Sequence, residues 1–355
     1  EDGRTWRSDD GGQSWFCCNS RETELNSNWW PSRGFEVTTD YSVKFSPWDH
    51  NYVYINYTDM GFFRSEDGGY SWRHAVTGVP YRNTFYDCAF DPTVAGKMWA
   101  VVSNNHDMPH DKMLRSSTFL TFTGAVVKST DYGATWSTVV YPRGVNGGCT
   151  TSLAIDPTST EGSRTLYVTV SGHGVYKSTD DGATWVSAST GLTMPNNNNS
   201  WQIKRMPDGT LYCSLTASYV AGTRYPGGLF KSTDGAATWT QVNTSQVLPY
   251  IFDFDVDTDD QNIIYVATHQ LAYDGRQGIY KTEDGGATWN RVFSLGDMAG
   301  VAIDPELHTR VYASLAQGED FWSDGGLYIS EDSGATWEKL ETFPFERYGP
   351  SWISY

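Results

Sequence analysis

Short runs of β-branched and aromatic residues recur along the chain and are separated by turns rich in Gly, Asp and Pro. Such runs of four to eight residues predict strands. One strand of each set ends in Asp-Pro, as in the segments 88–92, 152–157 and 301–305. A second is rich in Val, Ile and Tyr, as in the segments 51–58, 165–170, 262–268 and 310–315. A third begins at Gly, and a fourth follows a conspicuous Trp. The pattern predicts an all-β chain built from four-stranded units.

An octapeptide lies between the third and fourth strands of each unit and occurs seven times. It begins at Ser8, Ser65, Ser129, Ser178, Ser232, Thr282 and Ser330, with start-to-start spacings of 57, 64, 49, 54, 50 and 48 residues. Its third residue is always Asp, which accepts backbone N–H bonds in tight turns, and its fifth is Gly in six copies, which can adopt φ > 0. The fifth copy has Ala236 in place of that Gly. We expect the terminal Trp to pack under the hairpin as an apolar plug.

Repeats of this length, with four strands each, are typical of propeller blades. We therefore predict a seven-bladed β-propeller of four-stranded antiparallel blades over residues 1–355 as a single domain. Only seven residues precede the first octapeptide, so blade 1 lacks its first two strands at the N-terminus. Residues 338–355 could close the ring by supplying an inner strand to blade 1, or the chain could continue in a longer protein.

The pattern S-x-D-x-G-x-[TS]-W is identified as the Asp-box, or BNR repeat, and resembles that of sialidases, xyloglucanases and sortilin-type domains. In a propeller the Asp-box turns lie on one face, and the loops between second and third strands lie on the other. Ligand-binding residues are expected on the second face, where loops vary over a rigid scaffold.

The loops of that second face are rich in Trp, Tyr, Arg, His, Asn and carboxylates. Flat aromatic rings stack on sugar rings, and amides and charged groups bind hydroxyls, so the mixture favours a polysaccharide or oligosaccharide over a protein partner. The candidate substrate-binding residues are Trp29, Trp30, Arg82, Tyr86, His106, His173, Tyr219, Arg224, His269, Tyr273, Arg276 and Trp322.

Asp59 is the leading catalytic candidate. The segment 53–69 resembles the xyloglucanase-type glycoside hydrolase family, in which a TDIGG-like turn carries the catalytic base; Thr58-Asp59-Met60-Gly61 matches this turn, with Phe62 in place of its second Gly. The resemblance implies two facing propellers that each contribute one Asp to an inverting hydrolysis. Glu319 and Asp320 are the candidates within this chain for the second carboxylate. An Asp that only stabilises its turn remains an equal alternative.

A second chemistry is possible on the same face. A lyase acting on uronate-containing glycans needs a cation and a His or Tyr base, and His106, His173 and Tyr273 supply such groups together with Arg224 and Arg276. The third possibility is a non-catalytic module that binds a glycan or a protein. His106-Asp107 and His110-Asp111 have a spacing that could hold a metal, and Asp257 and its neighbours could hold Ca²⁺, but we expect polar surface at both places and no cofactor or metal.

Composition limits the partners further. The net charge of −17 disfavours a nucleic-acid partner, which needs clustered Lys and Arg. No run of 18 apolar residues is present, so the sequence predicts no membrane-spanning helix. The chain begins at EDGRTW, without an initiating Met or a signal peptide, and we expect a trimmed, secreted protein.

Overall fold

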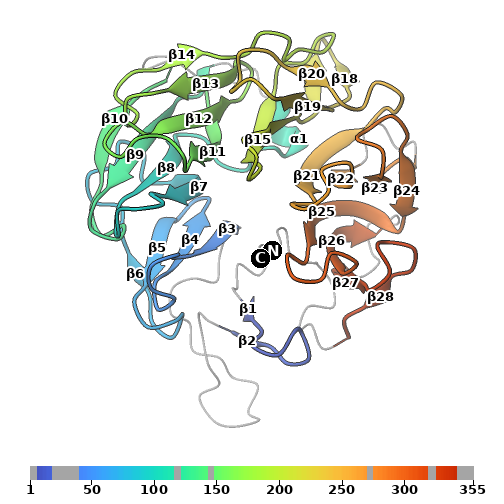
Figure 1. The fold of residues 1–355 in the computed structure, drawn as a ribbon, viewed down its shortest axis with the longest axis horizontal. Coiled ribbons are helices and arrows are strands. Elements are labelled where there is room, and N and C mark those ends of the chain that lie inside the picture. Colours follow the sequence, from blue (N-terminus) through green and yellow to red (C-terminus); the bar gives the residue numbers. More distant parts are fainter. Residues whose placement is uncertain are drawn as a thin grey trace.

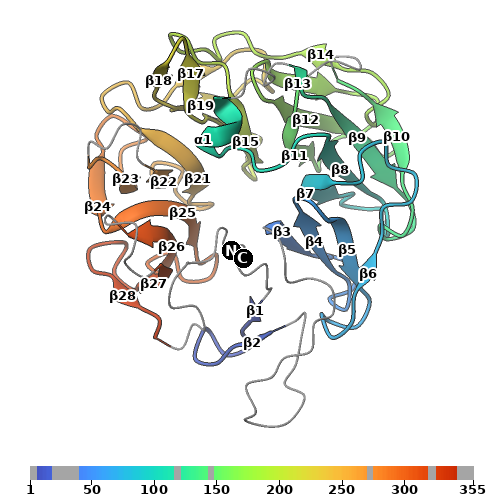
Figure 2. The ribbon, with the colours of Figure 1, turned by 180° about the vertical axis from the view of Figure 1, so that it is seen from behind.

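The structure is a computed structural model that describes residues 6–17, 40–115, 121–142, 148–269, 275–318 and 325–341. Its four-stranded antiparallel sheets are arranged as a ring, with the first strand of each on the inside (Figures 1 and 2). The one helix in this part of the chain, α1 (Asp111–Leu114), has four residues. None of the described helices could cross a membrane.

Six of the sheets are complete four-stranded blades, as the strand pattern predicts. In chain order their strands are β3 (Asp40–Phe45), β4 (Val53–Tyr57), β5 (Gly61–Ser65) and β6 (Arg73–His74); β7 (Thr84–Phe90), β8 (Met98–Ser103), β9 (Gly124–Ser129) and β10 (Ser137–Val140); β11 (Thr150–Asp156), β12 (Thr165–Val170), β13 (Gly174–Ser178) and β14 (Val186–Ser187). The other three blades contain β15 (Ser200–Arg205), β16 (Leu211–Leu215), β19 (Gly228–Ser232) and β20 (Thr240–Gln241); β21 (Tyr250–Val256), β22 (Ile264–His269), β23 (Gly278–Thr282) and β24 (Asn290–Phe293); β25 (Gly296–Ile303), β26 (Val311–Gly318), β27 (Gly326–Ser330) and β28 (Glu338–Lys339). A separate hairpin, β17 (Ser218–Val220) and β18 (Thr223–Tyr225), is inserted between β16 and β19.

The prediction of seven four-stranded blades is corrected to six in the described part of the chain. Among the described residues, the first octapeptide joins a pair of strands, β1 (Trp6–Arg7) and β2 (Phe16–Cys17). This pair lies in the ring between the first and last complete blades (Figures 1 and 2). Arg7 Nη1 donates to the Gly68 carbonyl on one side at 2.6 Å, and Trp15 packs near Leu340 on the other. Of residues 338–355, which we considered for closing the ring, β28 (Glu338–Lys339) pairs with β27 in the last complete blade, and residues 342–355 lie outside the described residues.

All seven octapeptides form the same hydrogen-bonded turn. The third-position Asp accepts the backbone N–H and the hydroxyl of the seventh residue, as between Asp131 and Thr135 at 2.9 and 2.6 Å. The first-position hydroxyl in turn accepts the N–H of the fifth residue, as between Ser129 and Gly133 at 2.9 Å. These hydrogen bonds, above all that from the seventh-position hydroxyl, lower the pKa of exposed members such as Asp332 to about 2. The Asp side chains are therefore engaged within their own turns, as a structural role requires.

Two consecutive residues of each turn adopt left-handed backbone, the fourth and the fifth. The sequence indicated only the fifth, because the fourth is often not Gly: it is Tyr132, Asp181 and Ser333 in three copies, with φ of 58°, 65° and 59°. Ala236 keeps the geometry in the copy that lacks the fifth-position Gly, with φ of 67° and its N–H 3.0 Å from Ser232 Oγ. The hydrogen bonds of the turn therefore hold residues that would otherwise avoid this conformation.

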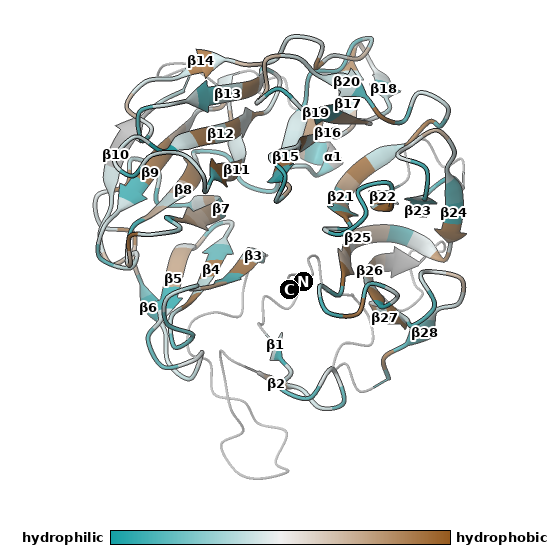
Figure 3. Ribbon diagram, in the orientation of Figure 1, coloured by the Kyte–Doolittle hydropathy of each residue, from teal (hydrophilic) through white to brown (hydrophobic). Residues whose placement is uncertain are grey.

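The core lies between neighbouring blades. The second strands are buried on both faces, as the hydrophobic runs of the sequence indicate. Hydrophobic and hydrophilic colours alternate along many of the strands, and many of the turns are hydrophilic (Figure 3). The octapeptide Trp contributes to this packing in two ways. Five indole N–H groups bond the fifth-position carbonyl of their own turn, whereas those of Trp136 and Trp239 bond Ala75 and Ala188 of the preceding blade.

The inner strands of the six blades surround a cavity of about 310 Å³ on the ring axis. Each inner strand contains a register shift, as a β-bulge produces. Lys44 pairs with Asp87 at 3.2 Å, and Lys204 pairs with Asp255 at 2.9 Å. Burial raises the pKa of Asp253, beside them, to about 6. Charged groups therefore share the lining of this cavity with apolar residues such as Leu153, Ile203 and Val301.

Candidate functional site

The turns that follow the second strand of each blade share one face of the ring, because successive antiparallel strands reverse direction. The turn between β4 and β5 carries Asp59, whose backbone is left-handed with φ of 64°. Its side chain is 44% exposed. A non-Gly residue in this conformation is held there by its surroundings and marks a position worth testing for function.

Tight packing beneath the turn explains the local conformation. Gly61 has φ of 78°, and a Cβ at this position would lie 2.3 Å from the carbonyl oxygen of Arg82. The Gly61 N–H donates to the Asn83 carbonyl at 2.9 Å, and Asn83 Nδ2 donates to Asp59 Oδ1 at 3.1 Å. The segment before β7 therefore anchors the turn and orients the Asp59 carboxylate. Arg82 itself is exposed.

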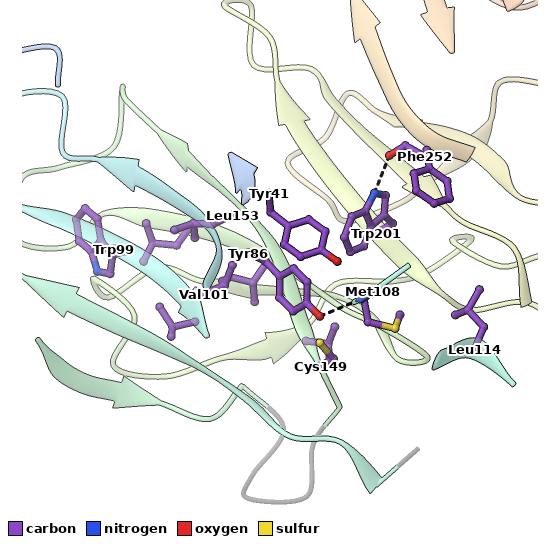
Figure 4. Close-up of a cluster of buried hydrophobic side chains, with 14 of the residues drawn as sticks. Tyr41, Tyr86, Trp99, Val101, Met108, Leu114, Cys149, Leu153, Trp201 and Phe252 are labelled. Carbon is purple, nitrogen blue, oxygen red and sulfur yellow. Dashed lines mark hydrogen bonds between the residues drawn. The ribbon is translucent and has the colours of Figure 1, made fainter. Parts of the chain in front are cut away.

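A long insert between β8 and β9 crosses this face toward the ring axis. Tyr86 Oη donates to the Asn105 carbonyl at 3.1 Å and accepts the N–H of Met108 at 3.2 Å, and Tyr250 Oη donates to the Pro109 carbonyl. Met108 is fully buried among Tyr41, Tyr86 and Trp201 (Figure 4). Tyr86, predicted to contact substrate, is enclosed in this core, and its role in the structure is to hold the insert.

The insert places His106 beside Asp59. His106 Nδ1 lies 3.4 Å from Asp59 Oδ1 and 3.0 Å from Asp107 Oδ2. Asp107 also pairs with Lys112 Nζ, and its backbone is left-handed with φ of 57°. The Asp107 N–H donates to Thr58 Oγ1 at 3.3 Å, which ties the insert to the residue before Asp59. Two of the residues predicted from separate loops, Asp59 and His106, thus form one cluster with Asp107.

This cluster has the residue types of a metal site, since one atom each from Asp59, His106 and Asp107 lies within 4.8 Å of the others. Asp107 also contacts the Lys112 ammonium, in addition to the His106 imidazole. We therefore interpret the cluster as an ion-paired network.

The other predicted histidines lie elsewhere on the face. His269 stacks on Phe252 with 3.6 Å between ring centroids and 7° between planes, and His110 meets the same Phe252 edge-on at 5.8 Å. Burial, followed by the nearby His110, lowers the pKa of His269 well below its usual value, so this imidazole is neutral. His173 is half-buried in the turn between β12 and β13.

The remaining described candidates are on the later blades. Tyr219 and Arg224 are cross-strand neighbours in the β17–β18 hairpin, and the Arg115 guanidinium lies 5.3 Å from the Tyr219 ring. Arg276 is exposed before β23, and its carbonyl accepts Tyr280 Oη at 2.7 Å. The predictions that fall outside the described residues are Trp29, Trp30, Tyr273, Glu319, Asp320 and Trp322.

Sequence reasoning missed Asn83 and Lys112 and considered Asp107 only as a metal ligand. Asn83 belongs to no motif. It lies directly before β7, in the connection between two blades, and this connection passes beside the turn between β4 and β5. The signal for Asp107 and Lys112 was the length of the insert between β8 and β9, because long loops over a rigid scaffold often bring residues to a site.

Comparisons with known proteins agree with this architecture. No protein-family model matches the chain. A xyloglucanase from Paenibacillus sp is 30% identical over 175 residues, 44% of this chain and 17% of that protein. A xyloglucanase from Hypocrea jecorina is 26% identical over 212 residues, 52% of this chain and 24% of that protein. The matches thus span less than a quarter of the length of these curated relatives.

Among solved structures, the GH74 xyloglucanase from Xanthomonas campestris superposes with a TM-score of 0.65 and 17% sequence identity. The superposition covers 98% of this chain and 53% of that protein. At this identity the likeness concerns the fold. The chain therefore resembles the xyloglucanase-type glycoside hydrolases. The resemblance in sequence covers about half of the chain, and the resemblance in propeller fold covers nearly all of it.

Proposed function

We propose that this chain is a glycoside hydrolase propeller that acts on a plant or microbial polysaccharide of the xyloglucan or β-glucan type, with Asp59 as the general base. The observation that carries the proposal is the exposed Asp59 carboxylate on the loop face. It is held in left-handed backbone and oriented by Asn83 at 3.1 Å. A base of this kind takes a proton from water as the water attacks the anomeric carbon.

The acid that protonates the leaving oxygen must come from another carboxyl group. Asp107 is unsuited, because its Oδ2 lies within 4.8 Å of the Asp59 cluster atoms, whereas inverting enzymes separate the two carboxyl groups by roughly 6.5–9.5 Å to admit water. We propose that the acid is supplied by Glu319 or Asp320, or by a second propeller in a longer protein, and that the protein is secreted.

A product screen tests the proposal. The purified protein is incubated with xyloglucan, other β-glucans and uronate-containing polysaccharides, and the products are measured by mass spectrometry. We expect oligosaccharides that have gained water and that disappear in the variant Asp59→Asn. Asp259→Asn is the matched control, because Asp259 is an exposed carboxylate that contacts a histidine, His308, on the opposite face.

Other outcomes of the screen identify the alternatives. Unsaturated products that absorb ultraviolet light would replace the hydrolase proposal by the uronate lyase. His269 is a poor candidate for the base of such a lyase, because its imidazole is stacked on Phe252 and its Nε2 atom is buried away from solvent. Glycan binding without any product, equal in wild type and Asp59→Asn, would instead support a non-catalytic binding module.

A further inference from the structure

The Nδ1 atom of His106 is buried, yet it has no hydrogen-bond partner among the described residues. Two carboxylate oxygens are nevertheless close to it, Asp107 Oδ2 at 3.0 Å and Asp59 Oδ1 at 3.4 Å. A buried polar atom without a hydrogen bond costs free energy, and a bound ion is one of the explanations for such an atom in a native structure. A common cation for the nitrogen and the two oxygens would explain why they approach one another without a hydrogen bond.

The distances between these three atoms fit a shared divalent cation. Two ligand atoms that each lie about 2.0–2.1 Å from a tetrahedral zinc ion are about 3.3 Å apart. The two distances from His106 Nδ1 are close to that value, and all three atoms lie within 4.8 Å of one another. Imidazole nitrogen and carboxylate oxygen are both ligands that zinc accepts, and water can complete the coordination.

The two carboxylates are held in place by the surrounding backbone and side chains. Asp59 and Asp107 both have left-handed backbone, with φ of 64° and 57°, which non-Gly residues adopt only where their surroundings hold them. Asn83 Nδ2 donates to Asp59 Oδ1 at 3.1 Å, and the Asp107 N–H donates to Thr58 Oγ1 at 3.3 Å. Carboxylates that bind metals are commonly oriented by outer hydrogen bonds of this kind.

In the ion-paired network, the Lys112 ammonium contacts Asp107 Oδ2, which is one of the three atoms. The Lys112 side chain is 64% exposed, so its ammonium can turn into solvent. A divalent ion carries twice the charge of the ammonium and can contact all three atoms at once. Lys112 should therefore compete with a metal ion for Asp107 and lower the affinity for that ion.

The cluster around His308 on the opposite face has the same residue types but different hydrogen bonding. His308 Nδ1 is hydrogen-bonded to Asp257 Oδ1 at 2.8 Å. The same oxygen accepts the backbone N–H groups of residues 259 and 260. Because its atoms are engaged in these hydrogen bonds, this cluster is a matched control for the one around His106.

We propose that Asp59 Oδ1, His106 Nδ1 and Asp107 Oδ2 bind a divalent cation of the zinc type, and that Lys112 weakens this binding. This inference replaces the expectation that the segment around His106 binds no metal. A cation on Asp59 makes its carboxylate a weaker base, so the metal inhibits hydrolysis. The inhibition rests on the proposed function, whereas the binding concerns the protein alone.

The first experiment measures binding of zinc to the full chain by isothermal titration calorimetry, after treatment with a chelator. We expect His106→Leu and Asp107→Asn to lower the affinity of this site at least about 10- to 100-fold. Lys112→Ala should raise the affinity, a result that misfolding cannot produce. The control variants His308→Leu and Asp259→Asn should bind zinc as the wild type does.

Cobalt provides a spectroscopic test of the same site, because Co²⁺ bound to nitrogen and oxygen in a tetrahedral site absorbs visible light. We expect these bands in the wild type and in His308→Leu, and their loss in His106→Leu. Equal zinc affinity in the wild type, His106→Leu and Asp107→Asn overturns the proposal. An effect of His308→Leu as large as that of His106→Leu also overturns it, because zinc would then not distinguish the two clusters. An unchanged or lower affinity in Lys112→Ala overturns the role given to Lys112.

The second experiment measures initial rates on the glycan identified in the product screen, with saturating zinc and then with excess EDTA. We expect zinc to lower the rate at least about 10-fold and EDTA to restore it, and we expect a smaller effect of zinc on the rate of Lys112→Glu-free controls such as His308→Leu only if zinc acts elsewhere. Zinc binding with an unchanged rate overturns the inhibition. An active hydrolase that does not bind zinc at His106 overturns this inference alone, and zinc binding in a protein without activity overturns the proposed function alone.

Discussion

A histidine lies between two aspartates at each end of the propeller, and the two clusters differ in what surrounds the carboxylates. At the loop face His106 meets Asp59 and Asp107; at the opposite face His308 meets Asp257 at 2.8 Å and Asp259 at 3.5 Å. Asp257 is only 2% exposed, and its Oδ1 also accepts the backbone N–H groups of residues 259 and 260. Asp59 is 44% exposed and receives a side-chain amide.

The difference separates a structural carboxylate from a candidate functional one. The oxygens of Asp257 are used to close a turn, as those of the octapeptide aspartates are, and the interaction with Asp257 raises the pKa of His308. Asp59 is instead held in a left-handed conformation with its carboxylate exposed. Residue types alone do not distinguish the two clusters; burial and backbone hydrogen bonds do.

The largest expected effect is on turnover. Asp59→Asn removes the base, and we expect kcat to fall by about 100-fold or more, while Asp259→Asn leaves it unchanged. Initial rates on the same glycan measure both variants. Equal loss in the two variants would remove the functional distinction between the two ends of the propeller.

The free energy of unfolding should depend more on the cluster of the opposite face than on the cluster that contains Asp59. Asp257→Ala leaves two backbone N–H groups and His308 without their acceptor in a buried position, and we expect the free energy of unfolding to fall by about 3 kcal/mol. Asp59→Ala removes a half-exposed carboxylate and its contacts with Asn83 and His106, and should change it by less than about 1 kcal/mol. Urea unfolding followed by Trp fluorescence measures both, and a larger cost for Asp59→Ala would contradict the comparison.

A buried carboxyl group in the cavity on the ring axis, Asp253, should make the free energy of unfolding depend on pH. Burial raises the pKa of Asp253 to about 6, so the folded state holds a proton that the unfolded chain releases near pH 4. The free energy of unfolding should therefore decrease as pH rises from about 4 to 6, by at most about 3 kcal/mol. Asp253→Asn should remove this loss, so that its stability relative to wild type improves by about 2 kcal/mol between pH 4 and pH 7, on top of a pH-independent cost because the amide cannot accept both the Phe254 and the Val301 N–H groups. Thermal melts at the two pH values measure it, with the exposed Asp259→Asn as control; a gain that is equal at both would exclude titration of Asp253 as the cause.

The smallest effect concerns backbone strain. Asp59→Gly relieves a left-handed non-Gly residue, and we expect a gain in stability of about 0.5–1 kcal/mol together with loss of turnover. Asp259→Gly, at a residue outside the left-handed region, should lose a similar amount of stability. Melting temperatures of the two variants compare them. A loss of stability in Asp59→Gly would show that the turn depends on the carboxylate.

The sequence by itself determined the features that act over a few residues. The octapeptide contains its own donors and acceptors within eight residues, so the turn and the four-strand rhythm around it could be predicted, and Thr58–Gly61 could be placed at the end of a second strand. The tertiary structure decided the number of complete blades among the described residues, the burial of Tyr86, and the meeting of Asp59 with His106, which is 47 residues away in sequence. The reason is physical: hydrogen bonds within a turn depend on local residue types, whereas a contact between loops of neighbouring blades depends on how the blades pack and on where the insert is anchored by Tyr86 and Tyr250.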